Sequence, residues 1–263
     1  MKTIFITGNH PRHIYLVKRF TKLFSNFKWI IETRDININD SVLRKKSKLY
    51  EKHILDFKKK EKIFFKETLS FLKRKKKKII NIKRNEINSV QFNKEILKII
   101  KKFKPKILFS YGCQKIDILK IRNKKIRCFN IHGGLLPKYR GVNTNFWPHK
   151  NSESNYIGLT LHELTDKIDS GDIYFQTTVS INKYDTINSL SCKAVMNFCN
   201  RVPKKIFYTL KKNFQIKGIK FKTNSKTWIK KDFKPNDIKV AYRNFKNFLK
   251  NENIKKPLLV NIY

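Results

Sequence analysis

Three polar side chains in the middle of the chain have the types and the spacing for acyl transfer to an amine. Asn130 and His132 lie two residues apart at the end of an apolar run, so on a strand both would point to the same face. Asp169 comes two residues before Gly171, where a tight turn can aim its carboxylate. An amide and an imidazole can donate hydrogen bonds to the oxyanion of a tetrahedral intermediate. The carboxylate can hold the imidazole protonated and help to take the proton that the attacking amine loses.

Glycine is concentrated around these residues. Six of the eight glycines lie between Gly112 and Gly171, and glycine lets a backbone turn sharply and approach a ligand closely. A histidine flanked by glycines can equally be a structural residue whose hydrogen bonds are satisfied. Residue types alone therefore leave the role of His132 open.

The elements that would carry these residues alternate between strands and helices. Short apolar runs predict strands at 1–8, 28–33, 107–111 and 126–131. Apolar residues at helical spacing predict helices at 13–24, at 40–75 as a pair, at 93–103 with Asn93 as its cap, and at 116–121. Such alternation is typical of an α/β fold, a Rossmann-like and mostly parallel sheet with helices on both faces. Ligands bind such sheets beyond the carboxyl ends of the strands, where Asn130 and His132 lie.

The second half of the chain completes this picture with two further strands, at 156–164 and 172–181. A helix is predicted from Thr186 to about Leu210, broken near Pro203. Alternating residues around Asn224-Ser225 predict a short C-terminal β-hairpin. We expect a catalytic domain at 1–212 and a small appendage containing this hairpin at 213–263.

Composition excludes several classes of protein. The 263 residues are 40% hydrophobic and 13% aromatic, which is too rich for a disordered chain. No run reaches the roughly 20 apolar residues of a membrane-spanning helix, and the N-terminus reads as a first strand and not as a signal peptide. A cytoplasmic location is therefore expected. The four cysteines have no spacing that suits zinc, so no metal is expected.

The net charge of +42 has two explanations. A nucleic-acid surface would gain affinity from it through counterion release. Base-composition drift would give the same profile, because only eleven of the 61 basic residues are arginine and Ile, Asn, Phe and Tyr are abundant. We favour drift, since arginine is the better residue for bidentate phosphate and base contacts. The lysine runs at 57–62 and 73–78 are then expected to be solvated and far from the site.

Motifs across about residues 105–181 resemble the folate-dependent formyltransferase family. Their order and spacing agree over a long interval, with these segments in succession: Asn130-Ile131-His132, Leu135-Leu136-Pro137, Tyr139-Arg140-Gly141, Trp147, Gly158-Leu159-Thr160-Leu161-His162, Asp169-Ser170-Gly171-Asp172-Ile173 and Gln176. The resemblance implies a Rossmann-like formyltransferase domain that uses 10-formyl-tetrahydrofolate as formyl donor. Asn130, His132 and Asp169 fall on the catalytic Asn, His and Asp of the family.

The same resemblance implies which residues hold the folate. Gly134, Leu135, Leu136 and Pro137 fall on the folate-contacting loop of the family, and Tyr111 and Gly112 are expected to contact the donor as well. Gly134 departs from the serine that many members have, which puts one local contact in question. His10 and His13 follow the first strand, where an acceptor phosphate could bind, although a capping or surface role is favoured for them.

Differences between this sequence and the subgroups of the family narrow the choice of acceptor substrate. The segment Gly8-Asn9-His10-Pro11-Arg12 lacks the phosphate loop of glycinamide-ribonucleotide members, and only about 50 residues follow Lys212, too few for the barrel of methionyl-tRNA members. A short C-terminal hairpin resembles the appendages of enzymes that formylate nucleotide-linked amino sugars for surface polysaccharides. We expect such a small-molecule amine as acceptor, and a homodimer is left open. Formylation of charged initiator tRNA is the alternative, and an inactive nucleic-acid-binding relative is a third reading.

Overall fold

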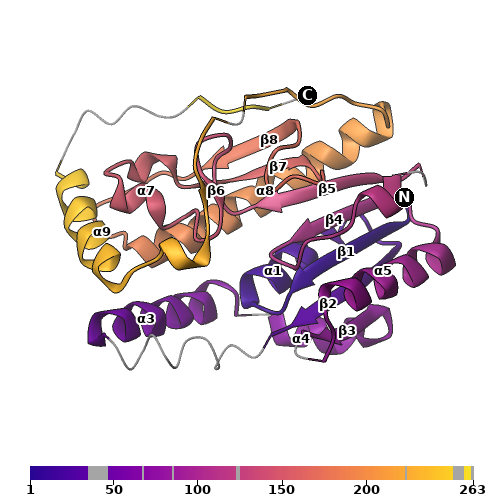
Figure 1. The fold of residues 1–263 in the computed structure, drawn as a ribbon, viewed down its shortest axis with the longest axis horizontal. Helices are drawn as coiled ribbons and strands as arrows, with labels where there is room; N and C mark the ends of the chain where they lie inside the picture. Colours follow the sequence, from indigo (N-terminus) through magenta and orange to yellow (C-terminus); the bar gives the residue numbers. More distant parts are fainter. Residues whose placement is uncertain are drawn as a thin grey trace.

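A seven-stranded sheet runs through the centre of the computed structural model, which describes residues 1–34, 47–66, 68–84, 86–122, 125–222, 224–250 and 258–261 (Figure 1). Its order is β3-β2-β1-β4-β5-β7-β8. The strands are β1 (Thr3–Gly8), β2 (Phe27–Thr33), β3 (Ile79–Lys83), β4 (Ile107–Tyr111), β5 (Arg127–His132), β7 (Gly158–Glu163) and β8 (Ile173–Thr178). The first five are parallel, and β7 and β8 add to β5 in antiparallel pairing. The predicted mostly parallel α/β fold is confirmed.

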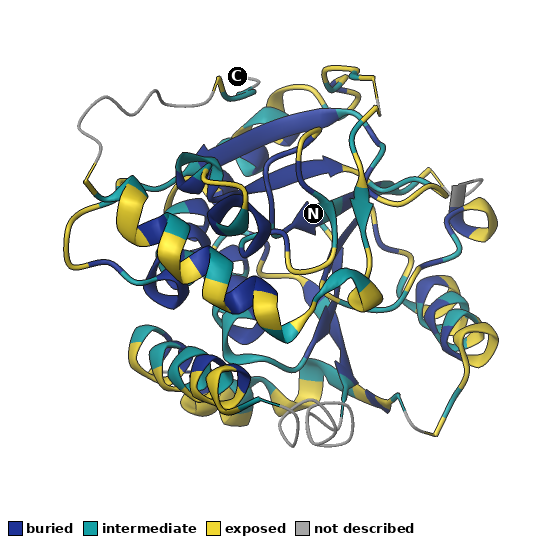
Figure 2. Cartoon of the chain, turned by 60° about the vertical axis from the view of Figure 1, so that its left-hand side comes forward, coloured by how far each residue is buried: buried dark blue, intermediate teal, exposed yellow. Residues whose placement is uncertain are grey.

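Helices cover both faces of the sheet. They are α1 (Pro11–Phe20), α3 (Lys48–Phe64), α4 (Thr68–Lys75), α5 (Ser89–Phe103), α6 (Leu119–Arg122), α7 (Trp147–Lys150), α8 (Ile187–Lys212) and α9 (Pro235–Phe248). Strand side chains alternate between the faces, so Phe5 packs into a cluster with α1 and α8 while Ile4 and Ile6 pack with α5 and α6. Figure 2 shows the strands buried and the helices exposed on their outer sides.

Two helices differ from the prediction. Helix α5 begins at Ser89, because the Asn88 side chain accepts from the Gln91 backbone amide and the Gln91 side chain accepts from the Asn88 backbone amide. Asn88, and not the predicted Asn93, is therefore the cap. Helix α8 runs unbroken through Pro203. Proline removes one backbone hydrogen bond of the helix. The residues after it, including Ile206 and Leu210, are nevertheless buried, and their packing stabilises the helix beyond Pro203.

The tail differs most from the prediction. Among the described residues the two expected hairpin arms do not pair with each other. Ile219 bridges Ile173 beside β8, and β9 (Thr227–Trp228) pairs in parallel with the short strand β6 (Arg140–Gly141). The prediction of a hairpin is therefore wrong, because one arm pairs with Ile173 and the other with β6. The domain boundary at 212 stays a prediction.

Some elements lay outside the expectations from sequence. Strand β3 follows the basic run at 73–78 as a half-exposed edge, and α9 was not predicted. The start of the helical stretch expected at 40–75 lies partly outside the described residues. Every helix in the described ranges is too short or too polar to cross a bilayer.

The Asn88 cap gives a test of the fold. Replacing Asn88 with Ala should lower the free energy of unfolding by about 1 kcal/mol, because the Gln91 amide loses its acceptor. Urea unfolding followed by circular dichroism measures the change. Asn88→Asp keeps an acceptor and should stay near wild type; an equal loss in both variants would contradict the capping role.

Candidate active site

Three polar side chains form a row across neighbouring strands at the carboxyl end of β5. Ser110 on β4 and His162 on β7 lie opposite Asn130 in the strand register, one on each side. Residues that are opposite one another across a sheet point to the same face. The row therefore follows from the pairing of three strands, of which the last two are antiparallel.

Asn130 is oriented by its neighbours in this row. The Ser110 hydroxyl donates to Asn130 Oδ1 at 2.8 Å, so the amide nitrogen points the other way. There it lies 3.0 Å from His162 Nε2 and 3.5 Å from Asp169 Oδ1. His162 Nδ1 lies 2.8 Å from the Glu163 carbonyl, which can only accept, so Nδ1 carries the proton and Nε2 accepts from Asn130. The amide is thus held as a donor toward the site.

His132 is held between a carbonyl and a carboxylate. Its Nε2 lies 2.7 Å from the Tyr139 carbonyl, to which it donates. Its Nδ1 faces Asp169 Oδ2 at 3.3 Å. The ring is only 5% exposed. A proton that reaches Nδ1 is therefore stabilised by the carboxylate beside it.

Asp169 is a buried carboxylate with a fixed direction. It adopts a left-handed φ of 47°, which aspartate tolerates better than most residues, and it is 8% exposed. Its Oδ2 accepts from the Gly141 amide at 2.8 Å. Arg140 holds the backbone of the same turn by donating to the Asp169 and Ile168 carbonyls. The tight turn expected around Asp169 is thus anchored from the 140–141 segment.

The pKa values of the pair follow from burial and mutual contact. Burial lowers the pKa of His132 below its ordinary value, and the nearby Asp169 opposes this only in part. Burial alone would raise the pKa of Asp169, but His132 above all, helped by the Gly141 amide, brings it well below its usual range. The sequence led us to expect that the carboxylate holds the imidazole protonated; in the structure burial opposes this effect and lowers the pKa of His132.

The row of Ser110, Asn130 and His162 and the pair of His132 and Asp169 line a cavity of about 1460 Å³. Asn130, His132 and Asp169 line it together, and so do Tyr111 and Gly112. Ligand pockets commonly measure about 300–1,000 Å³, so this one is large enough for two ligands side by side. The structure therefore brings the predicted catalytic residues together at one large site.

The segment 134–137 is placed differently from the expectation. None of its residues is among those that line the cavity, although the preceding Gly133 does. Leu135 and Leu136 are buried beneath the site. A Cβ on Gly134 would lie 2.7 Å from Thr144 Cβ and 2.9 Å from His132 Nε2, so the serine of other members would not fit here without moving both. The folate contacts assigned to this segment stay a prediction.

Basic side chains line the other end of the cavity. Arg12 pairs with the buried Glu61 at 2.6 Å, and Arg34 and Arg84 both pair with the fully buried Glu32. Lys58, Lys59 and Lys62 line the cavity too, so the run at 57–62 is not remote from the site as expected. The reason is that α3 packs along α8, which brings one side of the run to the opening.

His10 and His13 lie in this basic region. Arg12 above all, together with burial and Arg34, lowers the pKa of His10 to about 3. His13 is 3% exposed and contacts the Tyr111 ring, so it is not a surface residue. His10 precedes α1 without a side-chain cap. Both histidines line the cavity, in the place where an acceptor phosphate was considered.

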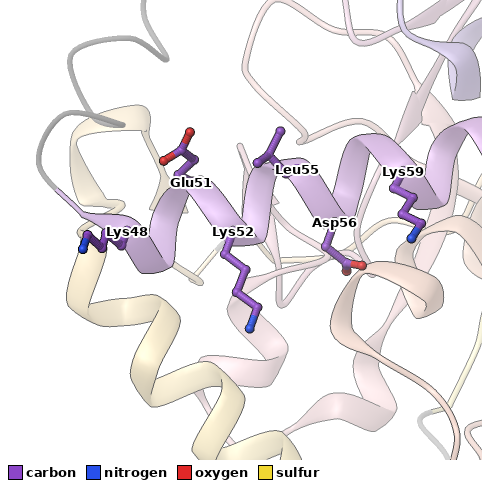
Figure 3. A pocket seen from close by; sticks show the side chains of 6 residues that line it. All are labelled: Lys48, Glu51, Lys52, Leu55, Asp56 and Lys59. Atoms are coloured by element: carbon purple, nitrogen blue, oxygen red, sulfur yellow. The ribbon is translucent and has the colours of Figure 1, made fainter.

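A second depression lies along the outside of α3 and has a volume of about 560 Å³ (Figure 3). Its lining residues all come from that one helix: Lys48, Glu51, Lys52, Leu55, Asp56 and Lys59. No histidine or cysteine is among them. Within the described part of the chain, no three His, Cys, Asp or Glu side chains are grouped to hold a metal ion.

Comparison with known proteins adds an independent line of evidence. The family model described as formyl transferase matches residues 53–197, which is more than half of the chain. The chain belongs to the formyl transferase family. Formyl transferases of this family take the formyl group from 10-formyl-tetrahydrofolate, and Asn130, His132 and Asp169 all lie inside the matched range.

Curated relatives match part of this formyl transferase chain. It is 44% identical over 108 residues to the bifunctional polymyxin resistance protein ArnA of Wigglesworthia glossinidia brevipalpis, covering 39% of the chain and 16% of ArnA. It is 33% identical over 104 residues to the methionyl-tRNA formyltransferase of Caldicellulosiruptor saccharolyticus, covering 38% of the chain and 32% of that enzyme. The matched part thus spans about a sixth to a third of these relatives.

A solved structure shares the fold over nearly the whole chain. It is a sugar 3-N-formyltransferase in the presence of dTDP and 5-N-formyl-THF, with a TM-score of 0.57 and 20% sequence identity. The alignment covers 98% of this chain and 82% of that one. At this identity the likeness shows the fold alone.

Sequence reasoning missed the residues that hold the three predicted ones in place. Ser110 orients Asn130, and the backbone amide of Gly141 holds Asp169. Alternation along 107–111 could have pointed to Ser110, but an amide donor leaves no trace in residue type. His162 ends the motif at 158–162, and its contact with Asn130 brings its ring to the site.

Replacing Asp169 with Asn tests the pair. We expect turnover to fall by roughly 10²–10⁴, the range for loss of an acid–base or charge-stabilising partner. The pKa of His132 should fall further, because the group that raises it is gone, so the acidic limb of the kcat/KM profile should move to lower pH. Steady-state rates measured across pH check both effects. Wild-type turnover would remove Asp169 from the chemistry, and an upward shift of the limb would contradict the coupling.

Proposed function

We propose that this enzyme transfers the formyl group of 10-formyl-tetrahydrofolate to a primary amine on a nucleotide-linked amino sugar. The observation that supports formyl transfer best is the convergence of a donor amide, an imidazole and an ionised carboxylate. Asp169 lies 3.3 Å from His132 and 3.5 Å from Asn130, and all three residues line the large cavity. Geometry of this kind suits a reaction that builds negative charge on oxygen and releases a proton from nitrogen.

The residues divide the work as follows. The amine nitrogen forms a bond to the formyl carbon, and the bond between that carbon and N10 of the folate breaks. Asn130 donates its amide hydrogen to the oxygen of the tetrahedral intermediate, since Ser110 and His162 hold the amide in that orientation. The pair of His132 and Asp169 takes the proton of the attacking amine, and a proton returns to N10 as it leaves.

The cavity fits two substrates at once. Its volume of about 1460 Å³ exceeds what one ligand of ordinary size needs. A Cβ at Gly133 would meet only Thr144 Oγ1, at 3.9 Å, so a flat ligand can come close to the backbone there. Gly112 is different, because the His13 ring lies 2.7 Å from where its Cβ would be. Gly133 directly follows His132 at the end of β5, and we assign the folate donor to its side.

Charge supports an acceptor that carries phosphates. Along the α1 and α3 side the cavity is lined by Arg12, Arg34, Arg84, Lys58 and Lys62, and the arginines are oriented by buried glutamates. The lowered pKa of His10 reports a positive potential there. The solved relative in the presence of dTDP is a sugar formyltransferase, and a nucleotide-linked sugar would bring its diphosphate to such a region.

One comparison favours a second acceptor. The match to a methionyl-tRNA formyltransferase and the net charge of +42 both suit charged initiator tRNA. A tRNA would engage many phosphates, and its affinity would fall by orders of magnitude between roughly 50 and 200 mM salt. A sugar nucleotide presents only a couple of phosphates and should show a weak dependence on salt.

An acceptor panel tests the function. Purified protein with 10-formyl-tetrahydrofolate should formylate at least one UDP- or dTDP-linked amino sugar, detected by mass spectrometry of the product. His132→Ala should abolish this turnover and serves as the control for contaminating activity. Turnover on charged initiator tRNA and none on the sugars would contradict the proposed amino-sugar acceptor. An absence of turnover on every amine would favour an inactive relative.

Substitutions at two pairs of lysines test whether phosphate binding depends on charge at the cavity or on the net charge of the protein. Lys58→Gln with Lys62→Gln removes charge from the cavity wall and should raise KM for the sugar nucleotide roughly fivefold, as expected for about 1 kcal/mol of charge interaction in water. Lys76→Gln with Lys77→Gln, an exposed pair that does not line the cavity, should change KM less than about twofold because of screening. Equal effects from both pairs would contradict a local phosphate site.

A further inference from the structure

A short strand from the tail pairs with the strand that holds the catalytic carboxylate. Trp228 on β9 lies opposite Gly141 on β6, and the Val142 amide donates to the Trp228 carbonyl at 2.9 Å. The approach is so close that a Cβ on Gly141 would lie 2.0 Å from the Trp228 carbonyl oxygen, and Gly141 has a φ of +92°. Only glycine fits this contact.

The same glycine donates its amide to Asp169. Gly141 therefore lies between the tail on one side and the carboxylate on the other, with its N–H 2.8 Å from Asp169 Oδ2. A shift of β6 away from the Asp169 turn would lengthen this bond first. A buried carboxylate that loses a charge-assisted donor becomes harder to keep ionised.

The indole of Trp228 fixes the tail strand. It stacks on Trp147 with ring centroids 4.1 Å apart and an interplanar angle of 14°. Trp147 is fully buried, and its Nε1 donates to the Val142 carbonyl at 2.8 Å. The Ser225 hydroxyl also donates to the Pro137 carbonyl, and Arg140 reaches the Ser225 carbonyl. Ring stacking and backbone pairing thus hold the same three-residue stretch, 140–142.

We propose that Trp228 is a positioning residue, which presses β9 onto β6 and so keeps the Gly141 amide on the Asp169 carboxylate. This assignment rests on the proposed role of Asp169 in formyl transfer. It explains why a segment almost 60 residues beyond Asp169 in the sequence is packed against the catalytic turn. It also explains the positive φ and the missing side chain at position 141.

Trp228 lines the cavity as well, so a direct contact with a substrate would be the competing role. The two roles differ in what they change. A substrate contact acts on binding and leaves the Gly141 hydrogen bond intact. A positioning residue weakens that bond in the free protein, before any substrate is present.

Amide hydrogen exchange reads the bond directly and needs no catalysis. In protein labelled with ¹⁵N-glycine, the Gly141 amide should exchange at least about tenfold faster in Trp228→Ala than in wild type. Gly158 on β7, whose amide donates to Asn145 Oδ1, is the internal reference and should change little. Trp228→Phe keeps a stacking ring and should restore protection. Tyr184→Ala removes an aromatic ring that is 82% exposed and should match wild type.

Further variants keep the test decisive. If Trp228→Ala does not fold, Trp228→Leu keeps the bulk without the aromatic stack and should show the same selective loss at Gly141. Unchanged exchange of Gly141 in the folded variants would overturn the proposal. Equal acceleration at Gly141 and Gly158 would overturn it too, because Trp228 would then support the whole fold and not the carboxylate.

Kinetics separate this proposal from the proposed function. On an acceptor found in the panel, Trp228→Ala should lower kcat by up to roughly 10²-fold with KM for the donor unchanged. Gly141→Ala, which forces β6 and β9 apart, should have a similar effect, and the double variant should lose little more. A rise in KM for the acceptor at unchanged kcat would support the substrate contact instead. Failure to find any acceptor leaves the exchange result valid by itself.

Discussion

The burial of the Asp169 carboxylate is the constraint on which the rest of the site depends. Removing a carboxylate from water costs several kcal/mol unless hydrogen bonds and a charge partner replace the solvent. Here the Gly141 amide on β6 and the His132 ring and Asn130 amide on β5 supply these contacts. The positions of β5, β6 and the 165–172 turn are therefore coupled, because a shift in any of them leaves a buried charge without a partner.

The strand pairing changes from parallel to antiparallel at β5, and this change brings the residues of the site together. In a sheet that stayed parallel, the end of β5 would be followed by another strand end and a helix. Instead β7 runs back alongside β5 and brings His162 opposite Asn130. Strand β7 ends with Glu163 opposite Phe129, and the loop at 164–172 then folds back so that Asp169 reaches His132. Asp169 thus meets residues far from it in sequence because this loop returns toward the end of β5.

Local patterns were enough to predict most strands and the three central residues. Apolar runs with flanking turns marked β1, β2, β4 and β5 closely, and motif spacing marked Asn130, His132 and Asp169. What could not be predicted depends on contacts between distant segments. The arms around Asn224-Ser225 have the alternation of a hairpin, but whether an arm pairs with its neighbour or with β6 depends on the open side of Gly141. The cap of α5 was ambiguous for another reason, because Asn88 and Asn93 are both good caps and only the reciprocal bond with Gln91 decides.

Charge is used differently at the two ends of the cavity, and this bears on the meaning of the lysine excess. Near Asp169 a single negative charge is fully paired and buried, whereas the α1 and α3 side gathers arginines whose directions are set by Glu32 and Glu61. Lysines on exposed faces need no such partners. Arginine is rare in this chain, and three of its eleven copies line this one wall. A drift toward lysine would replace arginine wherever a flexible point charge is sufficient. The arginines that remain here are held by buried carboxylates, Arg12 by Glu61 and Arg34 and Arg84 by Glu32.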